Sequence, residues 1–212
     1  MEMGIEGYEY LDAVQNDSHS YLCPALIRNL DALKLKSPAA GNASLFELGS
    51  GNGSTANLMS QTGWEVVGVD PSSQGMEMAS LNYPDISLSQ GSAYDDLALK
   101  FGQFPVVVSL EVVEHVYYPR KYAQTIFELL KPGGTAIIST PYHGYLKNVA
   151  LAVSGKMDNH FTALWDNGHI KFWSKKTLSI LLKEAGFEDI RFELVGRIPP
   201  LAKSMIAYAV KP

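Results

Sequence analysis

Short apolar runs alternate with helical patterns along most of this chain. Stretches with an apolar residue at every third or fourth position predict helices at 20–36, 54–62, 72–82 and 119–130. Between them lie five short runs typical of buried strands, at 45–48, 65–69, 86–88, 105–110 and 135–140. Strands that alternate with helices indicate a parallel sheet wrapped by helices, joined by right-handed crossovers.

The last third of the chain changes this pattern. Lys131-Pro-Gly-Gly134 predicts the end of one helix and a turn into the fifth strand, because proline cannot continue a helix and glycine adopts the left-handed stop. A helix is expected at 174–185, closed by Gly186. Two β-rich runs follow, at 188–195 and 204–210, and their connection through Pro199-Pro200 favours an antiparallel hairpin.

One long stretch interrupts the alternation, between Pro141 and Phe172. It is rich in Tyr, His, Asn and Gly and contains a short apolar piece with a helical pattern from Tyr145 to Val153. Loops of this length inside a compact domain usually cover or bind something, so residues 141–172 are predicted to form a substrate cap. The apolar piece leaves three roles open: a substrate wall, a dimer contact or a patch that faces a membrane.

Composition narrows the class of protein. A chain of 212 residues with 46% hydrophobic content is expected to form a single domain over 1–212, with residues 1–42 as a helical lid. The net charge is −5 and the longest basic run is Lys175-Lys176, which disfavours nucleic acid as a partner. A small-molecule substrate is expected, and the oligomeric state is not indicated.

The chain carries one cysteine, Cys23, so neither an internal disulfide nor a cysteine zinc site is expected. The first residues are acidic and lack the pattern of a signal peptide, and no apolar stretch reaches the roughly eighteen residues that span a bilayer. These features predict a cytoplasmic protein. A peripheral contact with a membrane stays open.

The glycine turn after the first strand is the clearest sign of a ligand. Leu45-Phe-Glu-Leu-Gly-Ser-Gly-Asn-Gly-Ser54 leads into a helix, and the next strand ends in Asp70. Glycines let a ligand approach the backbone, and an acid at the second strand end can accept the hydroxyls of a ribose. A dinucleotide turn, G-x-G-x-x-G, needs its third glycine at position 54, where this chain has Ser54.

This G-x-G-x-G turn, preceded by Glu47, resembles motif I of the class I methyltransferases that use S-adenosylmethionine. The acid suits a cationic sulfonium ligand better than an anionic pyrophosphate. The resemblance implies a Rossmann-like, doubly wound, seven-stranded α/β sheet, mostly parallel with an antiparallel C-terminal strand. The cofactor residues that it implies are Glu47, Gly49, Ser50, Gly51, Gly53, Asp70, Pro71, Ser92, Ala93, Leu110 and Glu111.

The segment Gly91-Ser-Ala-Tyr-Asp-Asp96 resembles the G-D-A segment in which family members bind the adenine amino group. This chain has Ser92 where the family has an acid. The adenine contact is therefore left to the Ser92 hydroxyl, the Ala93 amide, or the carboxylate of Asp95 or Asp96.

The loop after the fourth run contains Ser109-Leu-Glu-Val-Val-Glu-His115. A helical turn here would place Glu111, Glu114 and His115 on one face, since they are spaced i, i+3 and i+4. Two roles stay open. His115, assisted by Glu114, can be the catalytic base that removes a hydroxyl proton, or the three side chains can hold a divalent metal such as Mg²⁺.

The S-x-E-x-x-E-H pattern is similar to that of the ubiquinone-biosynthesis O-methyltransferases, and E-x-x-E-H recurs in small-RNA 2′-O-methyltransferases. Gly168-His-Ile-Lys-Phe-Trp-Ser174 looks like the segment that returns a further histidine to the metal in those families. The resemblance implies a metal shell of Glu111, Glu114, His115 and His169. The aromatic residues Tyr8, Tyr10 and Tyr21, with His19, resemble the lid over the cofactor.

The sequence thus favours methyl transfer from S-adenosylmethionine to a small molecule, at an oxygen centre. Two alternatives belong to other classes: a protein that binds S-adenosylmethionine without turnover, and an NAD-dependent oxidoreductase on a similar fold. The missing glycine at position 54 disfavours the oxidoreductase.

Overall fold

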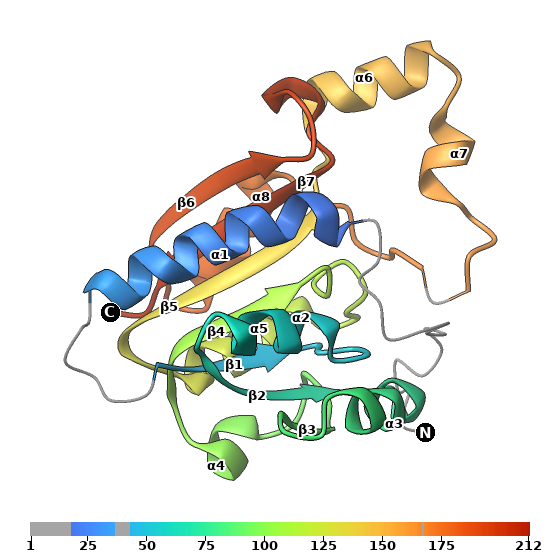
Figure 1. Ribbon diagram of the computed structural model, residues 1–212. Helices are drawn as coiled ribbons and strands as arrows, with labels where there is room; N and C mark the ends of the chain where they lie inside the picture. The colour runs from blue at the N-terminus through green and yellow to red at the C-terminus, as the bar shows by residue number, and fades with distance from the viewer. Residues whose placement is uncertain (1–17, 37–42, 167) are drawn as a thin grey trace.

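The computed structural model describes residues 18–36, 43–166 and 168–212, and it folds around one seven-stranded sheet (Figure 1). The strand order is β3-β2-β1-β4-β5-β7-β6. Strand β7 runs antiparallel to both β5 and β6, and the other pairs are parallel, as predicted. The strands are β1 (Ser44–Leu48), β2 (Glu65–Asp70), β3 (Ser87–Gln90), β4 (Phe104–Leu110), β5 (Leu130–Pro141), β6 (Glu188–Val195) and β7 (Ser204–Val210).

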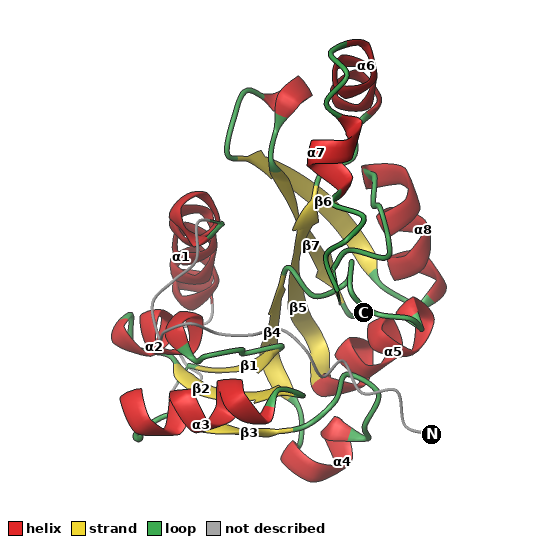
Figure 2. Ribbon diagram, turned by 90° about the vertical axis from the view of Figure 1, so that its right-hand side faces the viewer, coloured by secondary structure: helices red, strands yellow, loops and turns green. Residues whose placement is uncertain are grey.

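Helices cover both faces of this sheet. Figure 2 shows α1, α2 and α3 on one side and α4, α5 and α8 on the other, whereas α6 and α7 stand apart beyond the end of β5. The doubly wound α/β fold expected from the sequence is therefore confirmed. The helices are α1 (His19–Lys36), α2 (Ser54–Gln61), α3 (Ser73–Asn82), α4 (Leu97–Phe101), α5 (Pro119–Leu129), α6 (Tyr145–Val153), α7 (Met157–Phe161), α8 (Lys175–Glu184) and the 3₁₀ turn η1 (Pro199–Leu201).

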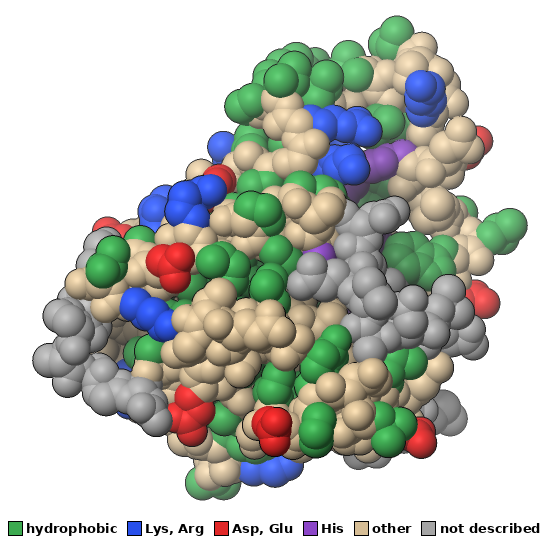
Figure 3. Space-filling view, in the orientation of Figure 1, with side chains coloured by type: hydrophobic (Ala, Val, Ile, Leu, Met, Phe, Trp, Pro, Cys, Tyr) green, Lys and Arg blue, Asp and Glu red, His purple; other side chains and the backbone are tan. Residues whose placement is uncertain are grey.

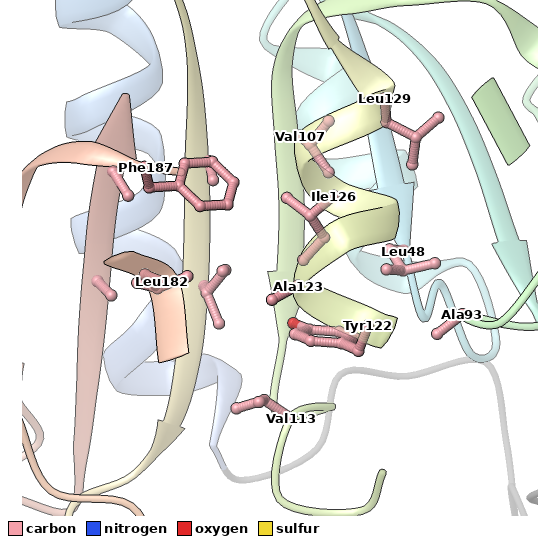
Figure 4. Close-up of a cluster of buried hydrophobic side chains, with 14 of the residues drawn as sticks. Leu48, Ala93, Val107, Val113, Tyr122, Ala123, Ile126, Leu129, Leu182 and Phe187 are labelled. Atoms are coloured by element: carbon pink, nitrogen blue, oxygen red, sulfur yellow. The ribbon is translucent and has the colours of Figure 1, made fainter. Parts of the chain in front are cut away.

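The central strands are buried on both faces, which is why they read as continuous apolar runs rather than alternating ones. One core cluster joins β1, β4 and β5 to α5 and α8, with Tyr122, Ile126 and Leu182 fully buried in it (Figure 4). A second cluster packs Leu22, Leu26 and other apolar residues of α1 and α2 on the opposite face. The sheet is thus a rigid support for the loops at its edges.

Short polar signals fix where several helices begin. Ser72 caps α3 by accepting a hydrogen bond from the Gly75 amide. Ser174 and Thr177 form a reciprocal capping box at the start of α8, and Pro119 occupies the first turn of α5, where its missing N–H costs nothing. These caps place the loops that precede α3, α5 and α8 in defined positions.

The structure differs from the predicted elements in a few places. Strand β5 already begins at Leu130, so Lys131-Pro-Gly-Gly134 lies within an extended strand and its register against β4 shifts between Phe104 and Val106. The predicted turn is therefore an irregularity in the strand, with Gly133 at φ 77°. Helices α4 and α7 are short and carried no clear periodic signal. Within the described residues, no helix has the length and apolarity that a membrane span requires.

Candidate functional site

The loops that follow β1, β2, β3, β4 and β5 all leave the carboxyl ends of parallel strands and so gather at one edge of the sheet. Helices α6 and α7 extend from the same edge, after β5 (Figure 1). Most of the side chains that the sequence indicated as functional lie on these loops.

The glycine turn follows β1, and three alternate residues in it adopt left-handed backbone angles. Gly49, Gly51 and Gly53 have φ values of 88°, 52° and 79°. A Cβ built on Gly49 would lie 2.4 Å from the Cγ2 of Val112, so side chains are excluded there by space as well as by backbone angle. The G-x-G-x-G pattern is therefore a physical requirement of this bend.

Asp70 stands at the end of β2, beside the glycine turn. Its carboxylate accepts one hydrogen bond from the Gly51 amide and another from the Ser72 amide, each 2.9 Å long. Burial raises the pKa of Asp70, and the two amide bonds oppose that rise. The two amides hold the carboxylate against the turn, and each of its oxygens keeps a further lone pair for a ligand hydroxyl.

Glu47 lies within β1 and is 2% exposed. Its Oε2 atom has no hydrogen-bond partner in the described part of the chain. Burial, followed by the nearby charge of Asp70, raises the pKa of Glu47 to about 8. A buried carboxyl oxygen without a partner is costly, so this position favours a ligand that brings a donor or a positive charge.

The loop after β3 is closed by its own polar groups. The Asp95 carboxylate accepts a hydrogen bond from the Ser92 amide at 2.7 Å, and the Ser92 hydroxyl accepts one from the Tyr94 amide at 3.2 Å. Ala93 is buried, and its carbonyl accepts a bond from Thr125 on α5. Of the predicted adenine contacts, Asp95 and Ser92 therefore shape the loop, whereas Asp96 is exposed at the start of α4.

Glu111 does not share a helical face with Glu114 and His115, so that expectation is wrong. Its φ is 54°, and the residues that follow form an irregular turn in which the His115 amide donates to the Val112 carbonyl. The Glu111 carboxylate instead accepts hydrogen bonds from two hydroxyls, those of Ser139 at 2.8 Å and Ser204 at 3.4 Å. Positive φ is uncommon at a residue with a side chain, and it is held here although the Glu111 charge still acts on Glu114.

Glu114, His115 and His169 do come together. One ligand atom from each lies within 4.8 Å of the others, and the Glu114 Oε1 atom is 3.9 Å from the His169 Nε2 atom. Glu114 is 1% exposed, and neither of its carboxylate oxygens has a hydrogen-bond partner among the described residues. The long-range pairing of His169 with this loop, expected from the resemblance, is present in the structure.

The histidines of this cluster are oriented by the backbone. The His115 Nδ1 atom lies 3.2 Å from the Gly168 carbonyl oxygen, which can only accept, so Nδ1 carries the proton and Nε2 is the unprotonated nitrogen of the neutral ring. Burial, with the nearby His115 and His160, lowers the pKa of His169 to about 4. Burial also raises the pKa of Glu114 well above its usual value, and the charge of Glu111 adds to that rise.

Three hydrogen bonds fasten the His169 segment to the loop after β4. The Glu114 carbonyl accepts from the Ile170 amide at 2.9 Å and from the Lys171 amide at 3.0 Å. The Trp173 indole N–H donates to the Val113 carbonyl at 3.1 Å, from a buried ring. The cluster is therefore built on two backbone segments tied side by side.

Some residues of the site carried no signal that sequence reasoning could use. Trp165 lies edge-on to both His115 and His169, with ring centroids 6.0 and 5.2 Å away. Ser139 and Ser204 reach Glu111 only because β5 and β7 are neighbours, which short-range spacing cannot reveal. Among the lid residues, the Tyr21 hydroxyl lies 3.4 Å from the Ser204 hydroxyl; Tyr8 and Tyr10 lie outside the described residues.

Other predicted cofactor residues lie near the same loops. Ser50 is buried beside the turn, and its amide bonds to the Val69 carbonyl together with the amide of Gly49. Pro71 directly follows Asp70, and its carbonyl accepts a bond from Gln90. Leu110 is the last residue of β4 and is 8% exposed.

Comparison with known proteins gives a consistent result. A family model described as a methyltransferase domain matches residues 15–191. Ubiquinone biosynthesis O-methyltransferases from Cereibacter sphaeroides and Ruegeria pomeroyi are 31% and 32% identical over 153 and 150 residues. Each alignment covers 69% of this chain and 60% of the relative, so the chain spans less than two thirds of these proteins.

Solved structures share the fold. Magnesium protoporphyrin IX methyltransferase from Synechocystis, with bound SAH, has a TM-score of 0.62 at 19% identity, and the match covers 96% of this chain and 91% of that one. A phosphoethanolamine N-methyltransferase from Haemonchus contortus, in complex with S-adenosyl-L-methionine, has a TM-score of 0.61 at 17% identity and covers 88% and 52%.

Proposed function

The chain belongs to the family of methyltransferase domains, and on that premise we propose that it transfers a methyl group from S-adenosylmethionine to an oxygen of a small molecule. The observation that carries the proposal is the bend of three left-handed glycines held against Asp70 at the carboxyl ends of β1 and β2. The two relatives named above as O-methyltransferases favour oxygen as the acceptor atom.

The residues at this bend fit S-adenosylmethionine. Asp70 is a buried carboxylate with lone pairs left for ribose hydroxyls, and Glu47 supplies an unpartnered carboxyl oxygen for the positive end of the ligand. We assign the glycine turn with Ser50, and the loops containing Pro71, Ser92, Ala93 and Leu110, to the rest of the cofactor's contacts. Glu111 closes the site through its hydroxyl partners Ser139 and Ser204.

S-adenosylmethionine would supply an electrophilic methyl group, so that the acceptor oxygen gains that methyl as the carbon–sulfur bond breaks. The sulfonium is already a good leaving group, and the protein's main tasks are therefore to align the acceptor and to remove its proton. His115 is assigned as the base: its Nε2 atom is unprotonated while Nδ1 donates to Gly168. Glu114, buried beside it, is proposed to assist this step.

The cluster of Glu114, His115 and His169 also fits a divalent metal. A buried carboxylate without hydrogen-bond partners and two imidazoles are a donor set that suits Mn²⁺, Zn²⁺ or, with added water, Mg²⁺. A metal bound there would lower the pKa of an acceptor hydroxyl. We propose these three residues as ligands. Glu111, which the resemblance also implied, accepts hydrogen bonds from two hydroxyls and keeps further lone pairs, so it stays a proposed fourth ligand.

Isothermal titration calorimetry of the full chain tests the cofactor assignment. We expect heat of binding with S-adenosylmethionine and none with NAD, and loss of that heat in Asp70→Ala. Binding of NAD instead would overturn the proposal. Methyl transfer to a panel of phenols and catechols is then measured for the wild type and for His115→Asn. If His115→Asn keeps both cofactor binding and methyl transfer, His115 is not the base. If the wild type binds S-adenosylmethionine without transferring its methyl group, the result supports a non-catalytic role.

The metal assignment is tested separately by Co²⁺ absorption spectroscopy, which reports ligand type without turnover. We expect d–d bands for the wild type and their loss in His169→Asn. His19→Asn, on α1, is the matched control. Unchanged spectra in His169→Asn would leave His115 as a metal-free base.

A further inference from the structure

Trp165 lies beside the histidines of the site and has no role in the proposed chemistry. It follows α7, in a segment that carries hydrophobic side chains on the surface, at the right of the view in Figure 3. Trp165 is 44% exposed and its neighbour Leu164 is 98% exposed. Trp165 belongs to neither of the two core clusters that the described residues form. The contacts of its indole are therefore made with the site rather than with the core.

The indole packs directly against the backbone of Gly168. A Cβ built on Gly168 would lie 3.0 Å from both the Cδ2 and the Cε3 atoms of the Trp165 ring, and 2.9 Å from the Trp165 carbonyl oxygen. The Gly168 amide also donates a hydrogen bond to that carbonyl, at 3.1 Å. Gly168 is thus held by the ring and by the backbone of the same residue, and a side chain at position 168 would displace the indole.

The carbonyl of Gly168 in turn holds His115. Its oxygen lies 3.2 Å from the His115 Nδ1 atom, the contact that assigns the proton to Nδ1 and leaves Nε2 unprotonated. A partner on one ring nitrogen fixes both the tautomer and the orientation of a histidine, and this holds for a base as well as for a metal ligand. The direction in which His115 presents Nε2 therefore depends on the place of this carbonyl.

Three rings pack edge to face around the same carbonyl. The centroid of the Trp165 ring is 6.0 Å from that of His115 and 5.2 Å from that of His169, and the two imidazoles are 4.9 Å apart. The interplanar angles are 84°, 60° and 70°, an arrangement that aromatic pairs prefer. Removal of the indole would take away a wall from both imidazoles.

The two limbs around His169 are attached to the loop after β4 in different ways. In the limb after His169, the Ile170 amide donates to the Glu114 carbonyl at 2.9 Å. In the limb before it, the contacts with the loop come from the Trp165 ring and from the Gly168 carbonyl. Packing of the indole is therefore part of what places the earlier limb.

Resting on the proposed function, we infer that Trp165 is a positioning residue: its indole holds the Gly168 carbonyl in place, and that carbonyl sets the tautomer and the direction of the His115 ring. The effect passes through the backbone of Gly168. The segment after α7 is then part of the catalytic geometry, and the indole acts on the reaction through His115.

Long-range ¹H–¹⁵N NMR spectroscopy of the full chain, with ¹⁵N-labelled histidine, tests this inference without turnover. The two ring nitrogens of a histidine have well-separated chemical shifts when the proton stays on one of them, and the shifts converge when the proton exchanges between both. We expect separated shifts for His115 in the wild type, with the proton on Nδ1, at about pH 8.5, which is above the ordinary histidine pKa. The signals are assigned by their absence in His115→Asn. In Trp165→Ala the two shifts should converge, because a released ring populates both tautomers.

Two further variants separate positioning from bulk. Trp165→Phe keeps a flat ring against Gly168 and should keep the separated shifts. Leu164→Ala removes the neighbouring apolar side chain, which is 98% exposed, and is the matched control that should give the wild-type spectrum. Calorimetry with S-adenosylhomocysteine should give the same affinity in the wild type and in these variants, because the glycine turn and Asp70 are unchanged.

Kinetics then connect the position of His115 to transfer. The acceptor is the phenol or catechol of the panel above that the wild type methylates fastest. We expect Trp165→Ala to lower kcat about tenfold to a hundredfold, because a displaced base loses much of its contribution, while the KM for S-adenosylmethionine stays unchanged. Trp165→Phe should recover most of that loss. The NMR comparison needs no acceptor and decides the positioning by itself.

The outcomes separate the two levels of argument. A wild type that binds neither S-adenosylmethionine nor S-adenosylhomocysteine contradicts the proposed function. If the cofactor binds and Trp165→Ala keeps either the separated shifts or the wild-type kcat, the indole only covers the segment and the inference is overturned. It is overturned as well if Leu164→Ala changes the spectrum as much as Trp165→Ala does, or if wild-type His115 does not carry its proton on Nδ1.

Discussion

Gly49 in the glycine turn gives a quantitative test, because a side chain added there would meet the Val112 side chain. In Gly49→Ala, two costs combine: φ at 88° is unfavourable for alanine, and the new Cβ would meet the Cγ2 of Val112 at 2.4 Å. The left-handed backbone costs about 1–2 kcal/mol, and overpacking adds about 1–3 kcal/mol. We expect a total loss of about 2–5 kcal/mol in the free energy of unfolding.

A matched control separates the two costs. Gly155, at the left-handed end of α6, has φ 66° and no atom within 4 Å of a built Cβ, so Gly155→Ala should lose the backbone part alone, about 1–2 kcal/mol. The double variant Gly49→Ala, Val112→Ala removes the obstructing methyl. A double-mutant cycle should therefore give a favourable coupling of about 1–3 kcal/mol.

Urea denaturation followed by far-UV circular dichroism measures the free energies of unfolding of the wild type, of the control, of Gly49→Ala and Val112→Ala, and of the double variant. Calorimetry with S-adenosylmethionine measures the accompanying loss of binding. The reasoning is refuted if Gly49→Ala is destabilised no more than Gly155→Ala, or if the double variant shows no coupling. Either result would mean that the turn relaxes freely around a side chain.

Three further changes test other parts of the structure. Because the pKa of Glu47 is raised to about 8, the folded state binds its proton more tightly than the unfolded state, so the free energy of unfolding should fall as pH rises from about 4.5 to 8. Urea melts of Glu47→Gln should show a shallower fall. Plots of stability against pH that are parallel for wild type and variant would contradict the raised pKa. Trp173→Phe removes the hydrogen bond to the Val113 carbonyl, so it should lower the free energy of unfolding by about 1 kcal/mol and weaken Co²⁺ binding. Full Co²⁺ affinity in the variant would show that this hydrogen bond does not position the cluster. Ile126→Ala, in the core between α5 and the sheet, should cost about 2–5 kcal/mol in the same melts, and a loss below about 1 kcal/mol would mean that the core closes around the gap.

Much of the fold could be predicted because its central strands and helices are long or strongly patterned. Runs such as residues 106–110, buried on both faces, are typical of central strands. The Pro199-Pro200 connection between the last two β-rich runs indicated the hairpin. Short elements such as α4 and α7 span five residues each, too few for a helical period to emerge.

The site was harder to predict than the fold. The glycine turn and Asp70 are adjacent in a simple βαβ unit, so local spacing was enough. Glu111 has a positive φ, and its amide and its carboxylate both bond to the Ser139 hydroxyl, a pairing that no spacing rule contains. Its partner Ser204 comes from a strand ninety-three residues away and could be recognised only once the sheet order was known.

The two ends of the long excursion between β5 and α8 are joined by a single backbone hydrogen bond, from the His143 amide to the Trp173 carbonyl at 3.0 Å. The return limb is also bound to the Glu114 carbonyl through the Ile170 and Lys171 amides, so the part before that limb is the part that can be lengthened, shortened or exchanged while the sheet keeps its shape. A chimera that receives another methyltransferase's segment at residues 144–161, with His169 and its bonds to the loop after β4 left in place, should therefore inherit that enzyme's acceptor selectivity.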